Sequence, residues 1–485
     1  PAAAAGLESS SASAGAASRA AAGRAASAGV GASSGVLMGR VAVLGLDCAE
    51  PSLVFDRFAA DLPNLRRLWE RGCKKRLRST DPPITVPAWA TMVTGKDPGA
   101  LGLYGFRNRA DHTYAGFTFA SSRNVAHEAI WDTLGRAGKN SIVVGVPPGY
   151  PPKPIRGHSI SCFLTPSAKS PYAYPAELKA EIEGKFGEYL FDVKDYRTDD
   201  RARLLRDLKA MTAQRWAVAT HLAATKPWDF LMVVEMGIDR LHHGFWSAFD
   251  EKHPRHVPGN PFQSAMPEYY RWLDGLLGEF LATLPAGTDV FVVSDHGACR
   301  MEGGIAINQW LLERGYLALK SVPEKATPFE KLDVDWPRTR AWAAGGYYGR
   351  LYLNVRGREP EGAIPASEAA AFRDRLAREI EAIPGFGDSP IPTRAVTPES
   401  LYPVRNGIPP DLFLYFGNLA WRSIGTVRRG APVQSRENDT GPDDANHDWH
   451  GIFIADRDTP ALAAEGEAMP IARVRRHVLE RFGMG

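Results

Sequence analysis

The chain has 485 residues, a formal net charge of +3 and 44% hydrophobic residues. This length supports a sizeable core, built either as one large α/β domain with an insertion or as two domains. The nearly balanced charge argues against a nucleic acid polymer or an anionic membrane as the main partner, and four cysteines without paired spacing favour a reducing, cytoplasmic setting.

Residues 1–37 differ in composition from everything that follows, because Ala, Ser and Gly dominate them. They contain no apolar run long enough for a signal-peptide core or a membrane span. We therefore predict a disordered, low-complexity tail. Met38 opens the run MGRVAVLGLD, which is typical of a protein start, so the tail is expected to be an extension that is not native. No transmembrane stretch is predicted in the remaining sequence.

Beyond the tail, short apolar runs alternate with longer helical patterns. Predicted strands cover 41–46, 141–145, 229–234 and 289–294. Predicted helices cover 62–71, 125–138, 199–226 and 264–284. This alternation predicts an α/β fold with a mostly parallel central sheet and helices on both faces. Short runs at 351–355, 411–415 and 451–455 are candidates for further strands.

Two segments depart from this alternation. The basic run RRLWERGCKKRLR at 66–78 is predicted to be a solvated helix and loop face. The stretch 301–345 is rich in Trp, Tyr and Pro, and a charged helical pattern follows at 366–383. We predict a core formed by 38–300 and 401–485, with 301–400 as an inserted cap over or beside the site. Aromatic residues of the cap would stack on a flat substrate group or pack in a core.

Three of the strand-like runs end in possible metal ligands. Asp47 ends VAVLGLD, Asp239 and His243 follow the run at 229–234, and Asp295 and His296 follow VFVVS. In open α/β sheets, binding sites form at the carboxyl ends of the strands, so these separate groups are expected to converge. Mixed carboxylate and imidazole ligands suit zinc or manganese better than calcium. The sequence therefore predicts a metal centre.

A further motif, PPITVPAWATMVTG at 82–95, contains a candidate nucleophile. Pro87 suits the first turn of a helix, which places Thr85 at or just before the helix N-terminus. A hydroxyl there faces free backbone N–H groups and the positive end of the helix dipole, and metal coordination would make it nucleophilic near neutral pH. The alternative is that Thr85 is only an N-cap.

Together these fragments resemble the alkaline phosphatase superfamily, and most of all its type I phosphodiesterase/nucleotide pyrophosphatase family. The similar residues are Asp47, the TVPAW that begins at Thr85, DRLHH at 239–243, SDHG at 294–297 and NHDWHGIFIA at 446–455. The resemblance extends over nearly the whole chain from residue 40. Sulfatases of the superfamily have Cys or Ser followed by Arg, where this chain has Thr85 and Trp89, so formylglycine chemistry is not expected.

The resemblance implies an alkaline phosphatase-like fold with two divalent ions, zinc or alternatively manganese, about 4 Å apart. One ion would be held by Asp47, Thr85, Asp295 and His296, and the other by Asp239, His243 and His447. His450 is an alternative to His447. His242 is a weaker alternative to His243, because only His243 has the i, i+4 spacing from Asp239 that places two ligands on one helical face.

The activity implied is hydrolysis of phosphodiester or pyrophosphate bonds in small, nucleotide-like substrates, through a phospho-threonine at Thr85. Nucleotide pyrophosphatases contact the phosphoryl oxygen through an Asn, and Asn108 or Phe106 falls at that place here. Alternatives are a phosphomonoesterase or another phosphoryl or sulfuryl hydrolase of the superfamily, with Arg107 and Arg109 as candidate sources of extra positive charge, and a non-catalytic metal-binding protein. The physiological substrate and the oligomeric state stay open.

Overall fold

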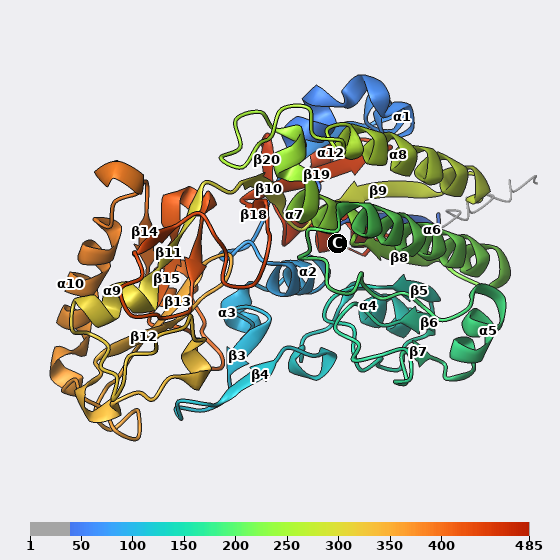
Figure 1. The fold of residues 1–485 in the computed structure, drawn as a ribbon. Helices are drawn as coiled ribbons and strands as arrows, with labels where there is room; N and C mark the ends of the chain where they lie inside the picture. The colour runs from blue at the N-terminus through green and yellow to red at the C-terminus, as the bar shows by residue number, and fades with distance from the viewer. Residues whose placement is uncertain (1–38, 485) are drawn as a thin grey trace, which may run out of the picture. The chain divides into compact units, whose positions relative to one another are not determined.

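The computed structural model describes residues 39–484, so the predicted tail lies outside the described residues. Its largest element is a nine-stranded sheet with the order β20-β2-β19-β9-β1-β8-β5-β6-β7 (Figure 1). Five of its eight neighbouring strand pairs are parallel, which confirms a mostly parallel sheet. The strands are β1 (Val41–Leu46), β2 (Cys73–Arg78), β5 (Ser141–Val144), β6 (Gly157–Ile160), β7 (Ala173–Tyr174), β8 (Phe230–Glu235), β9 (Asp289–Val293), β19 (His450–Ala455) and β20 (Ala468–Pro470).

The central strands β1, β8 and β9 are buried along their whole length. Parallel strands covered on both faces consist of nearly continuous apolar residues, which is why the sequence revealed them. Val41 lies opposite both Phe230 and Asp289, so the three strands run in register. Their carboxyl ends therefore meet at one edge of the sheet, and the residues that follow them emerge together.

Helices surround this sheet in two packed groups. In one group α6 and α7 pack against α8, and in the other α2 and α4 pack against α13. None of the described helices has the length and apolar character needed to cross a membrane. The helices around the sheet are α1 (Pro63–Arg71), α2 (Thr85–Thr94), α3 (Pro98–Leu101), α4 (Ile130–Arg136), α5 (Glu177–Phe186), α6 (Arg201–Thr225), α7 (Gly237–Phe249), α8 (Ala265–Thr283), α12 (Pro460–Ala463) and α13 (Arg473–Glu480).

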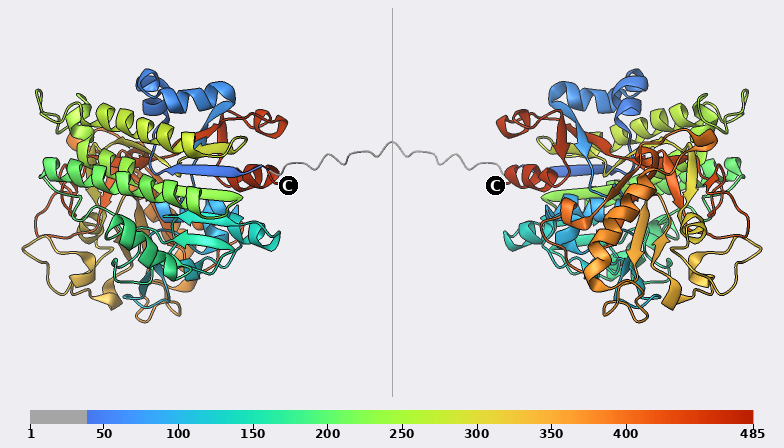
Figure 2. Two further views of the ribbon diagram at one scale, coloured as in Figure 1. Left: turned by 90° about the vertical axis from the view of Figure 1, so that its right-hand side faces the viewer. Right: turned by 90° about the vertical axis from the view of Figure 1, so that its left-hand side faces the viewer.

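A second hydrophobic cluster, separate from that of the central sheet, extends from Ile305 to Trp421. Its yellow and orange elements gather at one side of the central sheet (Figures 1 and 2). They include the four-stranded sheet β12-β13-β15-β14. Because β15 follows residue 400, the packed unit extends beyond the segment 301–400. Its elements are β11 (Gly303–Ala306), α9 (Ile307–Glu313), β12 (Ala341–Ala344), β13 (Gly349–Leu353), α10 (Ala369–Glu381), β14 (Arg394–Val396), α11 (Pro398–Leu401), β15 (Leu412–Tyr415), β16 (Trp421–Ile424) and β17 (Gln434–Ser435).

Two short pairs complete the strands: β3 (Arg107–Arg109) with β4 (Phe117–Phe119), and β10 (Gly297–Arg300) with β18 (Ala445–Asp448).

The prediction for the basic run 66–78 is wrong in its second half. After α1, residues 73–78 form β2, which pairs with β19 and β20. Lys74 and Arg76 are exposed while Leu77 is buried. The segment 73–78 has little apolar character of its own, and it forms a strand because it pairs with β19 and β20 from the other end of the chain.

Candidate metal centre

The candidate nucleophile begins helix α2. Thr85 follows Ile84, which occupies the N-cap position, and no side chain caps this helix. The structure therefore does not show Thr85 as an N-cap. Instead its Oγ1 atom lies 3.2 Å from His296 Nε2, and its side chain is 2% exposed. The hydroxyl is thus buried next to an imidazole that the sequence analysis assigned to the same site.

Thr85 belongs to a first group with Asp47, Asp295 and His296. His296 Nε2 lies 3.2 Å from Asp295 Oδ2 and 3.7 Å from Asp47 Oδ1. The other oxygen of Asp47 accepts a 2.7 Å hydrogen bond from Trp89 Nε1. Trp89 packs so closely on β1 that a Cβ at Gly45 would lie 2.6 Å from its ring. Because Gly45 has no side chain, the Trp89 ring can lie against β1 and hold the Asp47 carboxylate in place through its hydrogen bond.

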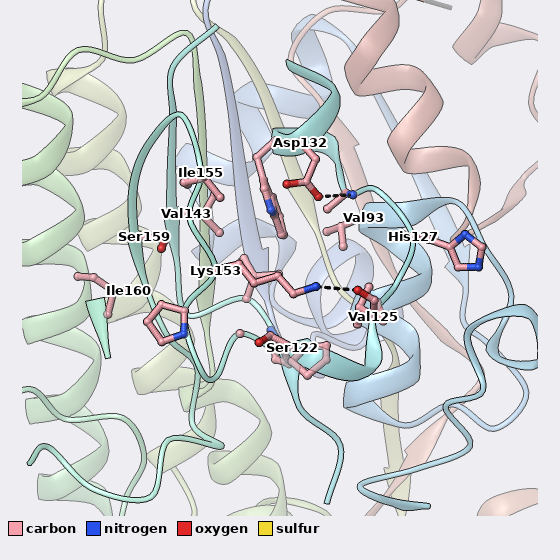
Figure 3. A pocket seen from close by; sticks show the side chains of 18 residues that line it. Val93, Ser122, Val125, His127, Asp132, Val143, Lys153, Ile155, Ser159 and Ile160 are labelled. Carbon is pink, nitrogen blue, oxygen red and sulfur yellow. Dashed lines mark hydrogen bonds between the residues drawn. The ribbon is translucent and has the colours of Figure 1, made fainter. Parts of the chain in front are cut away.

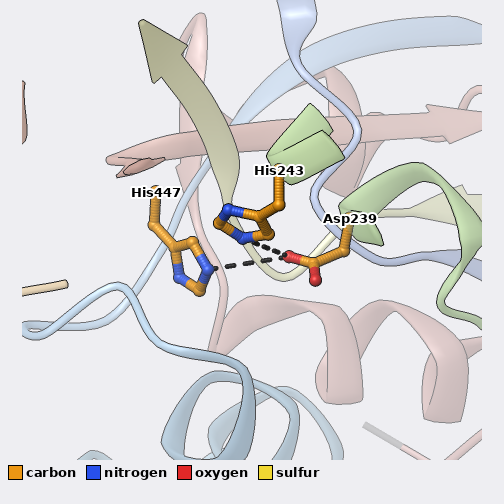
Figure 4. Close-up of side chains that lie close together, drawn as sticks. All are labelled: Asp239, His243 and His447. Carbon is orange, nitrogen blue, oxygen red and sulfur yellow. Dashed lines mark ion pairs between the residues drawn. The ribbon is translucent and has the colours of Figure 1, made fainter. Parts of the chain in front are cut away.

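Asp239, His243 and His447 form a second group (Figure 4). Asp239 Oδ1 lies 3.4 Å from His243 Nε2 and 3.6 Å from His447 Nε2. Helix α7 supplies the first two residues at i, i+4 spacing, and β18 supplies His447. Strand β18 pairs with β10 so that His447 lies opposite Ala298, and the His447 and His296 rings stack with centroids 3.8 Å apart. The two groups therefore adjoin.

Asp239 lies between the two groups. Ligand atoms of Asp47, Asp239 and His296 all fall within 4.8 Å of one another, although the family resemblance assigned Asp239 to the second ion alone. The other oxygen of Asp239 lies 2.5 Å from Arg240 Nη1. The structure thus brings together all seven residues that the sequence predicted as metal ligands.

The unpaired atoms of these residues fit a pair of cations. Asp47 Oδ1, Asp239 Oδ1, Asp295 Oδ2 and His243 Nε2 are buried and have no hydrogen-bond partner. Leaving such atoms unpaired in a protein interior is costly. These oxygen and nitrogen atoms could hold divalent metal ions, and such donors suit zinc and manganese.

The carboxylates also show the charge that such ions would neutralise. Burial raises the pKa of Asp47 and of Asp295, and neighbouring carboxylates raise both further. At Asp239 burial also acts to raise the pKa, but His243 and Arg240 outweigh it and hold the pKa well below its usual value. At Asp47 the positive charges of Arg240 and His243 do not outweigh burial and the neighbouring Asp239, so the charged form of this carboxylate stays disfavoured.

Each ligand imidazole is oriented through its Nδ1 atom. His243 Nδ1 donates to Asp443 Oδ1 at 2.7 Å, and Nδ1 of His296 and of His447 lies 3.0 Å from the carbonyl oxygens of Gly297 and Pro83. These bonds leave Nε2 of each ring directed at the site, as outer-shell partners of metal-binding histidines do. The sequence analysis did not identify Asp443.

The two alternative histidines lie outside these groups. His242 Nε2 lies 3.0 Å from the Tyr270 hydroxyl and its Nδ1 lies 3.6 Å from Cys48 Sγ. Burial lowers the pKa of His242 to about 3, so it is a neutral core residue. His450 begins β19, is partly exposed and has its Nδ1 3.5 Å from Arg76.

The candidate substrate contacts have different surroundings. Asn108 uses its amide locally, because Oδ1 accepts from Tyr104 N at 2.7 Å and Nδ2 donates to Gly105 O at 3.0 Å. Phe106 packs in the hydrophobic clusters that contain Ile84 and Val86, the neighbours of Thr85. Of the two, Phe106 therefore packs on the clusters that contain the neighbours of the candidate nucleophile.

One aromatic residue of the cap reaches the second group. Tyr347 lies between β12 and β13, and its ring stacks on His447 at 4.2 Å and on His243 at 4.9 Å between centroids. Its hydroxyl accepts a 2.7 Å hydrogen bond from Arg197 Nη2. Asn446 Nδ2 holds the Tyr347 carbonyl at 2.9 Å. Tyr347, from the segment 301–400, therefore packs against the two histidines of the second group.

Because Asp443 orients His243, we expect Asp443→Asn to lower metal affinity about 10- to 100-fold, the usual effect of losing such a partner. Asparagine removes the negative charge that stabilises the Nδ1–H tautomer. Metal affinity measured by competition with a chelating dye tests this. The matched control is Asp444→Asn, since the Asp444 side chain bonds Ser247 and Arg255 rather than an imidazole. Equal losses in both variants would contradict the role of Asp443.

A sheet edge that gathers two adjoining Asp/His groups beside a helix-terminal hydroxyl is the arrangement of phosphoryl hydrolases of the alkaline phosphatase superfamily. The chain belongs to the type I phosphodiesterase/nucleotide pyrophosphatase family, whose model matches residues 41–443. It is therefore an enzyme of the phosphodiesterase/pyrophosphatase type. A search of curated proteins gave no match.

Solved structures show the same fold at low sequence identity. Phosphonoacetate hydrolase from Sinorhizobium meliloti 1021, solved with phosphonoformate and with phosphonoacetate, has a TM-score of 0.58 and 16% identity, with 92% of this chain and 96% of that chain covered. Murine ectonucleotide pyrophosphatase/phosphodiesterase 5, solved as an inactive variant with AMP, has a TM-score of 0.50 and 13% identity, with 92% and 96% covered.

Proposed function

We propose that this protein is a divalent metal-dependent hydrolase of phosphodiester or pyrophosphate bonds in small, nucleotide-like substrates, and that it acts through a phospho-threonine at Thr85. The observation that carries the proposal is the position of Thr85 Oγ1, 3.2 Å from His296 Nε2 at the start of α2. Because Ile84 occupies the N-cap position and no side chain caps α2, helix capping does not account for this hydroxyl.

The proposed ligands are Asp47, Thr85, Asp295 and His296 for one ion and Asp239, His243 and His447 for the other, with zinc or manganese as the ions. When bound, these ions would lower the pKa of the hydroxyl and neutralise charge on the phosphoryl and leaving oxygens. Ligand atoms of Asp239 also lie within 4.8 Å of those of Asp47 and His296, which supports Asp239 as a candidate ligand for the first ion too.

The chain's own groups define the course of the reaction. Thr85 Oγ1 loses its proton and attacks phosphorus, the bond to the leaving oxygen breaks as that oxygen takes up a proton, and the phosphoryl group is held on Thr85. Free N–H groups of the first turn of α2, together with the helix dipole, stabilise the negative phosphoryl oxygens. Water then attacks phosphorus, which releases the phosphate product and restores the hydroxyl. Two inversions give net retention of configuration.

The pairing of three arginines favours a diester over a monoester. A monoester carries a second negative charge that needs an additional cation. Arg109 is instead paired with Glu359 at 2.9 Å, and Arg197 with Asp443 at 3.0 Å. Arg240 is paired with both Asp192 and Asp239. These guanidinium groups are already neutralised, which supports a substrate with one negative charge at the reacting phosphorus.

We expect kcat/KM for a nitrophenyl phosphodiester to exceed that for nitrophenyl phosphate by about tenfold or more, which corresponds to about 1.4 kcal/mol of transition-state binding. The panel should include phosphonoacetate, the ligand of the first structural relative. A preference for nitrophenyl phosphate would replace the proposal with the phosphomonoesterase alternative.

Removal of metal by a chelator should abolish turnover, and zinc or manganese should restore it, because the buried carboxylates need the positive charge. Elemental analysis of the chelated protein is the control for complete removal. Full turnover by protein shown to be free of metal would disprove metal dependence.

A further inference from the structure

Two cavities meet at the end of α2 that is farther from Thr85. The first lies between α2, the strands β5 and β6, and the loop around residues 122–132 (Figure 3). The space inside it that a small group can occupy is about 70 Å³, below the roughly 300–1,000 Å³ of pockets for drug-sized ligands, so it suits only a small apolar group. Most of its lining is apolar, from residues that include Val93, Val125, Trp131, Val143, Ile155 and Ile160.

Asp132 is the one carboxylate among the residues that line this first cavity, and its Oδ2 accepts a 2.9 Å hydrogen bond from Ala129 N at the start of α4. It is therefore already used within the protein. The interior of the cavity is suited to an apolar group, because burying apolar surface there removes it from water.

The second cavity adjoins the first and is cationic. Lys96, His127, Arg475 and Arg476 line it together with Glu128. His127 lines both cavities, and Thr94 of the second directly follows Val93 of the first. The two spaces thus share a boundary at the C-terminal end of α2.

The acidic residues nearby neutralise only part of the charge of this second cavity. Glu128 is paired with Arg136, and Arg476 is paired with Glu480 at 2.7 Å. Arg475 donates to a neutral acceptor, Thr133 Oγ1, at 2.8 Å, while its buried Nε has no partner.

Cations at the end of a helix complement its dipole, and this accounts for Lys96. It does not account for a partly buried guanidinium without a carboxylate. Burial and the neighbouring Arg136 lower the pKa of Arg475, so its surroundings disfavour its charge. A bound anion at Arg475 would offset both the burial of its charge and the repulsion from Arg136.

We propose that the two cavities form a single binding site for an amphipathic anion, in which Arg475 and Lys96 bind a carboxylate or phosphate headgroup and the apolar cavity holds a short alkyl or aryl body. The site is separate from Thr85, because the nine steps along the helix from Thr85 to Thr94 span about 13.5 Å. It therefore goes beyond the proposed function and does not depend on it.

Calorimetric titration of the metal-loaded protein with octanoate tests the site, with octanol and acetate as probes of each half alone. Octanoate should bind saturably with one site per chain. Octanol and acetate should each bind at least about tenfold more weakly, because each lacks either the anionic headgroup or the apolar body. Arg475→Gln should weaken octanoate binding by about tenfold or more. Arg473→Gln is the matched control, because Arg473 is on the same helix but does not line either cavity.

Ile155→Trp provides a second test, since it fills the apolar cavity from a partly exposed position. It should weaken octanoate without changing acetate binding. No saturable octanoate binding, or binding unchanged by both Arg475→Gln and Ile155→Trp, would overturn the proposal. Acetate bound as tightly as octanoate would show a simple anion site and would also overturn it. Because the readout is binding, a wrong assignment of the catalytic reaction would leave these results unaffected.

Discussion

Thr85→Ala is expected to abolish hydrolysis while leaving metal binding largely intact. The hydroxyl contributes one oxygen to the site, but that oxygen is the proposed attacking atom, so its removal affects the chemical step most. We expect a fall in kcat of at least about a thousandfold, comparable with the loss of other catalytic groups. Hydrolysis of a phosphodiester, with metal restored after chelation, measures the effect.

Thr85→Ser is the matched control for this experiment. Serine keeps the hydroxyl and loses only the methyl group that restricts the rotamer, so partial activity should remain. Isolation of a phosphorylated peptide containing residue 85 from the native enzyme would provide direct support. Undiminished turnover by Thr85→Ala would remove Thr85 from the mechanism, and a water molecule would have to be the nucleophile.

Asp295→Ala should lose both metal binding and activity. Asp295 is fully buried and its Oδ2 has no hydrogen-bond partner among the described residues, so it is available as a ligand. Its loss removes an anion and leaves His296 without the carboxylate 3.2 Å away. Metal affinity should fall by more than the roughly 10- to 100-fold typical of residues that contact ligands only indirectly.

Asp295→Asn separates charge from shape, because the amide preserves one oxygen and the side-chain volume. We expect it to bind metal more weakly than the native protein but better than Asp295→Ala. Metal content after dialysis, compared with the thermal unfolding of each apo protein, distinguishes a ligand from a residue needed only for folding. Normal metal content in Asp295→Ala would exclude it from the ligand set.

The parts of this fold that could be predicted have local signatures. The runs that became β1, β8 and β9 are apolar throughout because both faces of the sheet are covered. Asp47, Asp239 and Asp295 each follow such a run, so the order of residues along the chain is enough to infer the edge on which they meet. The i, i+4 spacing also distinguished His243 from His242, which the structure places against Tyr270.

The parts that were missed depend on contacts between distant segments. Asp443 sits in a loop with a second acid beside it, and only the packing of that loop on α7 brings it to His243. Tyr347 was one of several aromatic residues in its segment. Trp336 and Trp342 pack on each other at 5.1 Å, whereas Tyr347 reaches the ligands. Nothing in their spacing distinguishes these roles.

The position of β2 within the sheet has a consequence for the order in which the protein can be assembled during synthesis. β2 is made early, but its two neighbours, β19 and β20, are made from residues 450–455 and 468–470. His447 lies just before the first of these neighbours. The edge of the sheet at β2 cannot pair with β19 and β20, and the second group cannot form, until nearly all of this sequence has left the ribosome. We therefore expect nascent chains that end before residue 447 to be protease-sensitive at residues 73–78 and unable to retain metal at the second group.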